Sequence, residues 1–229
     1  MNLDKAIKEL EWVADRGARI VYMSTAPVAG PVGYRSMAHP EFDPFWELMQ
    51  EKGIVLGFHQ IVNRRFSVDL AELDGNGVAG AYWVKPYNAA FRALATPRWQ
   101  ISDFVASMIG HGMLTRFPRL KVAIVEFFSD WMIPMVDQFE RAYDAAPVLF
   151  DENPLDVMRR NIFFHIFSAK DPVAVIDRIG VDNCMWGSDF PHPEGLRDPL
   201  AFSEAITGYT KDQQRKIMGG TLAKLLDVA

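Results

Sequence analysis

The chain has 229 residues, of which 49% are hydrophobic and 23% charged, so it can bury a sizeable core and is not a disordered protein. Its formal net charge is −5 and its sequence pI is about 5.5, and no dense run of Lys and Arg offsets that charge. This balance argues against nucleic acid as a partner.

The single cysteine, Cys184, excludes an internal disulfide, and its apolar surroundings favour a buried, reduced thiol. We therefore expect a cytoplasmic protein. The first residues lack the apolar segment of a secretory signal, and no stretch approaches the ~20 apolar residues that cross a bilayer. We expect a soluble chain with no membrane partner.

Apolar residues at helical spacing predict a first helix from Leu3 to Ala14, ended by Gly17. Five short apolar runs predict strands at 18–24, 54–59, 120–126, 161–167 and 183–189. Helical patterns lie at 40–52, about 101–116, 130–145, 171–179, and at the end from Pro199 and from Lys211. Apolar strands that alternate with helices are typical of a covered parallel sheet, so the fold class is α/β. Without a repeat, charge block or linker, we expect a single domain over residues 1–229.

Periodicity alone does not separate a closed barrel from an open doubly wound sheet. In both folds ligands bind beyond the carboxyl ends of the strands, where His59, Glu126, His165 and Asp189 are expected. No Gly-x-Gly-x-x-Gly turn follows a strand, which weakens the dinucleotide-binding alternative. The long connection at 60–97 is interpreted either as a lid or interface, or as a packed surface excursion.

Asp189 is the first candidate for chemistry because it stands where a buried strand meets a Pro-containing loop. A desolvated carboxylate needs a cation, a donor network or a metal; the alternative is a structural Asp that caps the next turn. His59 ends another strand, and imidazole with carboxylate is a common pairing for a divalent metal, although a lone histidine is more often a satisfied core residue.

Three further residues are candidates for lining the pocket or supporting its ligands. His165 alternates with Phe163, so it either points into the barrel or packs in the core. Glu126 is a candidate acid or base, substrate contact or salt-bridge partner. His192 lies in a Pro-punctuated loop with Glu194 and could orient Asp189, or the loop could simply shape the turn. We interpret the remaining histidines, His39 and His111, as structural.

The sequence Gly187-Ser188-Asp189-Phe190-Pro191-His192-Pro193-Glu194-Gly195 closely resembles the last-strand motif of the amidohydrolase-related metal-dependent hydrolases. Further similarities run over nearly the whole chain: Gly57-Phe58-His59, the run from Arg116 to Val122, Glu126 with Trp131 and Pro134, and the closing Lys216-Ile217-Met218-Gly219-Gly220. The resemblance implies a TIM-like (β/α) barrel with His59 as a metal ligand on the fifth strand. It also implies that Asp189 on the eighth strand is both metal ligand and proton-transfer carboxylate, with zinc as the commonest ion.

The chain departs from the family pattern in two places. The family's opening strand carries a His-x-His or Glu/Asp-x-His pair, which is absent here, so the five predicted strands resemble strands four to eight. Where many members place a catalytic histidine on strand six, this chain has Glu126. Strand edges left open by a shortened barrel invite pairing with another chain, so we expect a homo-oligomer.

Three functions follow from the resemblance. The first is a metal-dependent hydrolase that acts on a C–N, C–O or similar bond of a small molecule. The second is a metal-dependent nonoxidative decarboxylase of an aromatic-type carboxylic acid. The third is a non-catalytic barrel remnant, because tight metal sites need three or more protein ligands.

Overall fold

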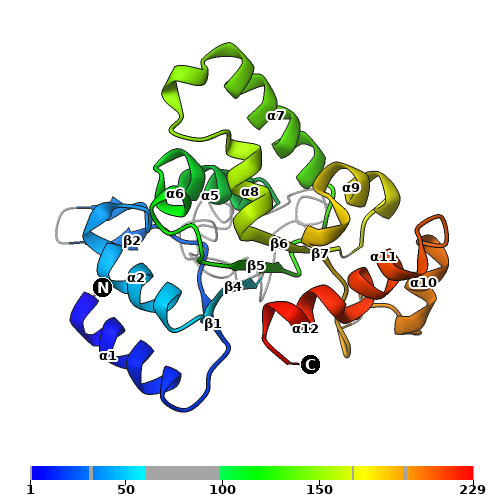
Figure 1. Cartoon of the computed structure of the whole chain (residues 1–229), viewed down its shortest axis with the longest axis horizontal. Coiled ribbons are helices and arrows are strands. Elements are labelled where there is room, and N and C mark those ends of the chain that lie inside the picture. Colours follow the sequence, from blue (N-terminus) through cyan, green and yellow to red (C-terminus); the bar gives the residue numbers. More distant parts are fainter. Residues whose placement is uncertain (1, 31–32, 60–97, 167, 193–194, 229) are drawn as a thin grey trace, which may run out of the picture.

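The computed structural model describes residues 2–30, 33–59, 98–166, 168–192 and 195–228. Five strands cross the middle of the molecule with helices around them (Figure 1), namely β1 (Ile20–Met23), β4 (Val55–His59), β5 (Val122–Val125), β6 (Ile162–His165) and β7 (Cys184–Met185). A separate two-stranded hairpin is formed by β2 (Val28–Ala29) and β3 (Tyr34–Arg35). The predicted long connection at 60–97 lies outside the described residues.

The described helices alternate with the strands of the main sheet. They are α1 (Leu3–Ala14), α2 (Asp43–Glu51), α5 (Arg98–Gly110), α6 (Met113–Arg116), α7 (Met132–Ala145), α8 (Pro154–Asn161), α9 (Pro172–Ile179), α10 (Phe202–Ala205), α11 (Lys211–Arg215) and α12 (Thr221–Leu225). A π-type turn at Lys216–Gly220 joins the last two. Among these helices, none is long and apolar enough to span a membrane.

The main sheet is parallel throughout, and its spatial order β1-β4-β5-β6-β7 follows the chain order. A doubly wound sheet reverses its strand order at a switch point, whereas a sheet that always advances in one direction is singly wound. Because crossovers between parallel strands are right-handed, constant advance places the connecting helices on one face and leaves the other face toward a barrel interior. The described strands therefore form an open arc of an α/β barrel.

The two faces of this arc bury different side chains. Leu56, Phe58, Ile124 and Phe164 are each at most 1% exposed and belong to the large core that packs against the helices. On the opposite, inner face, Val55, Ala123 and Met185 form a smaller cluster that packs against leucines at the C-terminal end of the chain, Leu222, Leu225 and Leu226. The segment that ends in helix α12 therefore covers part of the inner face, beside Val55, Ala123 and Met185.

Gly57 has a packing role on the inner face. Its register partners are Tyr22 on β1 and Ala123 on β5, so these three residues form one row across the sheet. A Cβ atom at position 57 would lie 2.9 Å from ring atoms of Tyr22 and from Cδ1 of Ile20. Only glycine allows Tyr22 to lean across β4 toward His59, whose ring lies 6.4 Å away in an edge contact.

Some predicted boundaries needed correction. The helix expected at about 101–116 is divided into α5 and α6, because Gly112 adopts a left-handed φ of 68° between them. Helix α8 was missed, although Asn153 accepts a hydrogen bond from the Leu155 N–H as an N-cap and Pro154 follows it. The strands are shorter than the apolar runs, since Asn161 ends α8 rather than beginning β6.

Asn161 connects neighbouring strands at their amino ends. Its side chain is fully buried, and its Nδ2 donates to the carbonyl oxygens of Leu120 at 2.7 Å and Pro118 at 3.2 Å, both in the turn that leads into β5. Asn183 does the same before β7, donating to the carbonyls of Arg159 and Ile162 at 2.7 Å each. These amides donate to main-chain carbonyl groups near the amino ends of β5 and β6, which helps to satisfy buried polar atoms.

Replacing Asn161 with Ala should lower the free energy of unfolding by about 2–3 kcal/mol, because the Leu120 carbonyl would remain buried without a donor. Urea denaturation followed by circular dichroism measures this loss. Asn153→Ala is the control, since losing only an N-cap should cost about 1 kcal/mol. Equal losses in the two variants would contradict the clamping role of Asn161.

Candidate metal and catalytic site

Four candidate side chains stand at the carboxyl edge of the sheet. His59 and His165 are the last residues of β4 and β6, and Glu126 directly follows β5. Asp189 follows β7 after a short extended segment. Because parallel strands end at the same edge, residues from four separate parts of the chain meet here.

Both carboxylate residues have an unusual backbone conformation. Glu126 has a φ of 62° and Asp189 a φ of 59°, in the left-handed region that residues with a Cβ rarely adopt. Such a conformation costs on the order of 1–3 kcal/mol for each residue and persists only where the surroundings hold it. The left-handed residue directly follows β5 in the case of Glu126 and comes four residues after β7 in the case of Asp189. In both places the chain changes direction at the carboxyl edge of the sheet.

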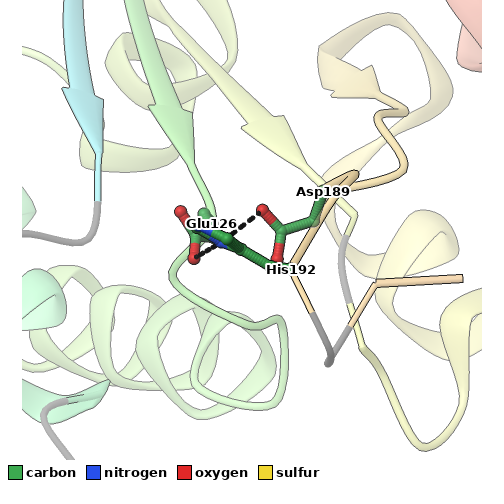
Figure 2. A group of neighbouring side chains, drawn as sticks. All are labelled: Glu126, Asp189 and His192. Carbon is green, nitrogen blue, oxygen red and sulfur yellow. Dashed lines mark ion pairs between the residues drawn. The ribbon is translucent and has the colours of Figure 1, made fainter.

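Glu126 is the centre of the cluster. Its Oε2 lies in contact with His59 Nε2, and its Oε1 lies 3.5 Å from Nδ1 of His192. The same His192 nitrogen lies 3.2 Å from Oδ1 of Asp189 (Figure 2). His192 therefore lies between the two carboxylates and His59 lies on the other side of Glu126, so these side chains form one continuous cluster.

Two carboxylate oxygens of the cluster are buried without a hydrogen bond. These are Oε2 of Glu126, where His59 is near but does not meet hydrogen-bond geometry, and Oδ2 of Asp189. The side chains of Glu126 and Asp189 are only 8% and 10% exposed. Two buried anionic oxygens without donors are costly unless a cation or a proton compensates them.

The donor atoms suit a single divalent cation. One ligand atom from each of Glu126, Asp189 and His192 can be chosen so that all lie within 4.8 Å of one another. Two ligands of one ion are at most about 4.2 Å apart when each bond is about 2.1 Å long, so small adjustments bring these atoms to one ion. Carboxylate and imidazole are ligands of zinc and manganese, and the uncompensated oxygens supply a reason to bind either ion.

His165 supports the cluster from below and is 6% exposed. Its Nδ1 accepts a hydrogen bond from the Glu126 backbone N–H at 3.2 Å, and its Nε2 lies 2.8 Å from the carbonyl oxygen of Gly187. Because Nδ1 accepts, the ring is neutral and the Nε2–H donates to Gly187. Burial lowers the pKa of His165, which maintains this neutral form. The ring thus ties together the two loops that carry the carboxylates.

Burial raises the pKa of Glu126 above its ordinary value, and the nearby Asp189 carboxylate raises it further. His59 and His192 act in the opposite direction, because their positive forms would stabilise the Glu126 anion. Desolvation is the largest of these effects. Without a bound cation, Glu126 is therefore harder to ionise than an exposed glutamate.

The structure brings together most of the residues that the sequence singled out. His59, Glu126, Asp189 and His192 share the cluster, and His165 contacts its backbone. Glu194 lies outside the described residues. His39 is elsewhere, where its Nδ1 accepts a hydrogen bond from the Glu41 N–H at the start of a short helical turn.

The sequence predicted Glu126 as an acid or base, a substrate contact or a salt-bridge partner that lines the pocket. The structure places its carboxylate between His59 and His192. One signal was present, since Glu126 directly follows an apolar strand as His59 ends one. The identity of its neighbours depends on which strands are adjacent, and this order is not visible in the pattern.

Comparisons with known proteins agree with this parallel α/β fold. The sequence profile of the Amidohydrolase family matches residues 4–228. An amidohydrolase of Mycobacterium avium subsp. paratuberculosis has 31% sequence identity and a TM-score of 0.83, with 98% of this chain and 56% of that chain covered. The chain therefore belongs to the amidohydrolase family.

More distant solved structures share the fold. A 5-carboxyvanillate decarboxylase from Sphingomonas paucimobilis is 18% identical with a TM-score of 0.69, covering 100% of this chain and 64% of that one. A dihydroxybenzoic acid decarboxylase from Polaromonas, solved with bound manganese and the inhibitor 2-nitroresorcinol, is 16% identical with a TM-score of 0.70, covering 99% and 66%. The chain thus spans about three fifths of the length of the structures it matches.

The raised pKa of Glu126 predicts a pH-dependent stability difference in chelator-treated protein. A carboxyl group whose pKa is raised by folding contributes stability that is fully present below the unfolded pKa and lost as pH rises through the folded pKa. Glu126→Gln copies the neutral form, so it should melt at a higher temperature than the unmutated protein at neutral pH. The difference should narrow as the pH falls toward the acidic range.

Thermal melts across this pH range test the prediction. Glu204→Gln, an exposed change of the same type on α10, is the control and should show no such convergence. If the difference between Glu126→Gln and the unmutated protein were independent of pH, the Glu126 carboxylate would not carry the expected desolvation cost.

Proposed function

We propose that the chain forms the metal-binding part of an amidohydrolase-type enzyme that hydrolyses a C–N, C–O or similar bond of a small molecule. The observation that carries the proposal is the pair of buried oxygens, Glu126 Oε2 and Asp189 Oδ2, that accept no hydrogen bond. They lie within one cluster with His59 and His192, the two members of the cluster that can carry a positive charge.

Each residue of the cluster would have a separate role. Glu126, Asp189 and His192, whose ligand atoms lie within 4.8 Å of one another, would hold a divalent ion, with His59 beside Glu126 as a further ligand. Such an ion acidifies water and polarises a carbonyl when bound. Asp189 would also accept the proton from the attacking water, because Oδ2 has no other donor while Oδ1 is held near His192. Besides lying in this ligand group, His192 would orient Asp189, and its side chain, which is 53% exposed, would be open to substrate.

The metal is a divalent ion, and we propose zinc first because imidazole takes part in the cluster. The two carboxylates make manganese a direct competitor, since oxygen-rich sites suit that ion. Manganese is present in the dihydroxybenzoic acid decarboxylase that shares this fold. Titration of metal-free protein with both ions would rank them.

Decarboxylation of an aromatic carboxylic acid is the second candidate. Two decarboxylases of such acids share the fold, and Tyr22 exposes 51% of its surface on the inner face next to His59. An aromatic ring there could stack on an aromatic substrate. Products from a panel of carboxylated aromatic compounds and of esters, lactones and amides separate the two, since release of carbon dioxide without incorporation of water indicates the lyase.

We also propose a cytoplasmic homo-oligomer. Among the described strands, β1 and β7 each pair on one side only, and such edges favour association with another chain. Burial raises the pKa of Cys184 to about 12, so this thiol is inert in a reducing compartment. Light scattering measures the oligomeric state directly.

Metal analysis tests the metal site. Zinc-supplemented protein should bind close to one equivalent of metal, and Asp189→Asn should lose most of it, because an amide is a poor ligand for a hard cation. Asn tolerates the left-handed φ, so the fold should be retained. The control is Asp212→Asn, a change on exposed α11 that should leave the metal content unchanged. Little metal in the unmutated protein would favour a non-catalytic remnant.

His165 is proposed as a positioning residue, and its variants should separate positioning from stability. In His165→Gln the amide oxygen and nitrogen can replace both hydrogen bonds, whereas His165→Ala removes them. The Ala variant should bind metal about 10–100-fold more weakly, as expected when support of ligands is lost. The Gln variant should recover most of that affinity. If the two variants lose affinity equally while both remain folded by circular dichroism, His165 does not act through these bonds.

A further inference from the structure

A cavity of about 490 Å³ lies at the opposite edge of the sheet from the carboxylates. It is bounded by residues that precede or begin strands, Lys121 before β5, Phe163 in β6 and Asp182 before β7, and by the segment Lys216–Leu225 near the C-terminal end. A volume of 300–1,000 Å³ is typical for pockets that bind small molecules. The proposed metal site does not use any of these residues.

The cavity concentrates positive charge in a chain whose formal net charge is −5. Four cationic side chains line it, namely Lys121, Arg159, Lys216 and Lys224, against one carboxylate, Asp182. Asp182 is already paired with Lys216 at the rim. Among the described residues, Arg159 and Lys224 make no ion pair within 4 Å, so the cavity keeps positive charge that no carboxylate of its lining neutralises.

Lys121 is a cationic residue of the lining that also makes a main-chain contact. Its Nζ donates to the carbonyl oxygen of Arg160 at 2.7 Å, which uses one of the three ammonium donors. Burial lowers its pKa, and the positive charges of Arg160 and Lys224 lower it further. An anion in the cavity would relieve this repulsion.

The walls of the cavity are partly apolar. The ring of Phe163 and the side chain of Leu225 line it beside the cationic groups. Apolar walls with a few charged groups at fixed positions are typical of a pocket for a ligand that has an apolar body and a charged group. Several cations near one another suit a doubly charged group better than a single carboxylate.

We propose that this cavity binds a phosphate monoester with a small apolar body, independently of the metal site. Lys224 and Arg159 bind the phosphate, and Phe163 and Leu225 contact the apolar part. The Lys216–Asp182 pair sets the charge of the rim.

Calorimetric titration of the full chain with phenyl phosphate at low salt tests this inference. Lys224→Glu should weaken binding about ten-fold or more, since it replaces attraction by repulsion. The control Lys211→Glu has the same charge change on exposed α11, away from the cavity, and should bind nearly normally. Asp182→Asn removes the one carboxylate that the described residues contribute to the lining and should tighten binding about two-fold or more. Unfolding would weaken binding in both variants, so tighter binding in Asp182→Asn together with weaker binding in Lys224→Glu would show an effect of charge.

Asp189→Asn separates this inference from the proposed metal site and should leave phenyl phosphate binding unchanged. Binding lost in Asp189→Asn but kept in Lys224→Glu would place the ligand at the carboxylate cluster and overturn the inference. Equal weakening by Lys224→Glu and Lys211→Glu would show unspecific attraction, and benzoate binding as tightly as phenyl phosphate would overturn the assignment to a phosphate. Absence of phenyl phosphate binding to the unmutated chain would also overturn it.

Discussion

The main constraint on this structure is a pair of buried carboxylates that lie close together at the carboxyl edge of the sheet. Glu126 and Asp189 are each at most 10% exposed at the side chain, share the same histidine neighbour, and stand in left-handed backbone conformations. Both features work against stability, since like charges repel and residues with a Cβ resist a positive φ. Proteins retain such arrangements where function needs them, and a divalent cation is the group that would turn this repulsion into binding.

The rest of the strand-end architecture can be understood as support for this pair. His165 uses one ring nitrogen for the backbone of Glu126 and the other for the carbonyl of Gly187, so β6 links the loops that follow β5 and β7. Gly187 leaves room for this ring, because a Cβ at position 187 would lie 3.2 Å from Nε2 of His165, a tight contact that would require the ring to shift slightly. Gly57 likewise leaves room on β4 for the ring of Tyr22, which makes an edge contact with the ring of His59. Each loop position is thus determined by a contact on a neighbouring strand.

The sequence predicted the α/β class, the five main strands and the edge of the sheet at which the candidate side chains meet, because these follow from local patterns. The apolar run that ends at His59 and the one that precedes Glu126 each indicate a strand and the residue at which it ends. The sequence could not give the central position of Glu126 or the two-sided contact of His192, since these depend on which strands are adjacent and on two left-handed turns at non-glycine residues. Helix α8 was missed because its eight residues immediately precede β6 and the two patterns merge.

The parallel sheet also separates charge between its two edges. Strand β5 shows this separation most directly, with Glu126 of the carboxylate cluster after its carboxyl end and Lys121 of the basic cavity before its amino end. Only four residues separate Lys121 from Glu126, yet the strand places their side chains at opposite edges. This polarity gives one short sheet an edge with two buried carboxylates and an edge rich in cationic side chains. A change in charge at either edge should therefore be felt mainly at that edge, because buried apolar residues such as Ala123 and Ile124 lie between them.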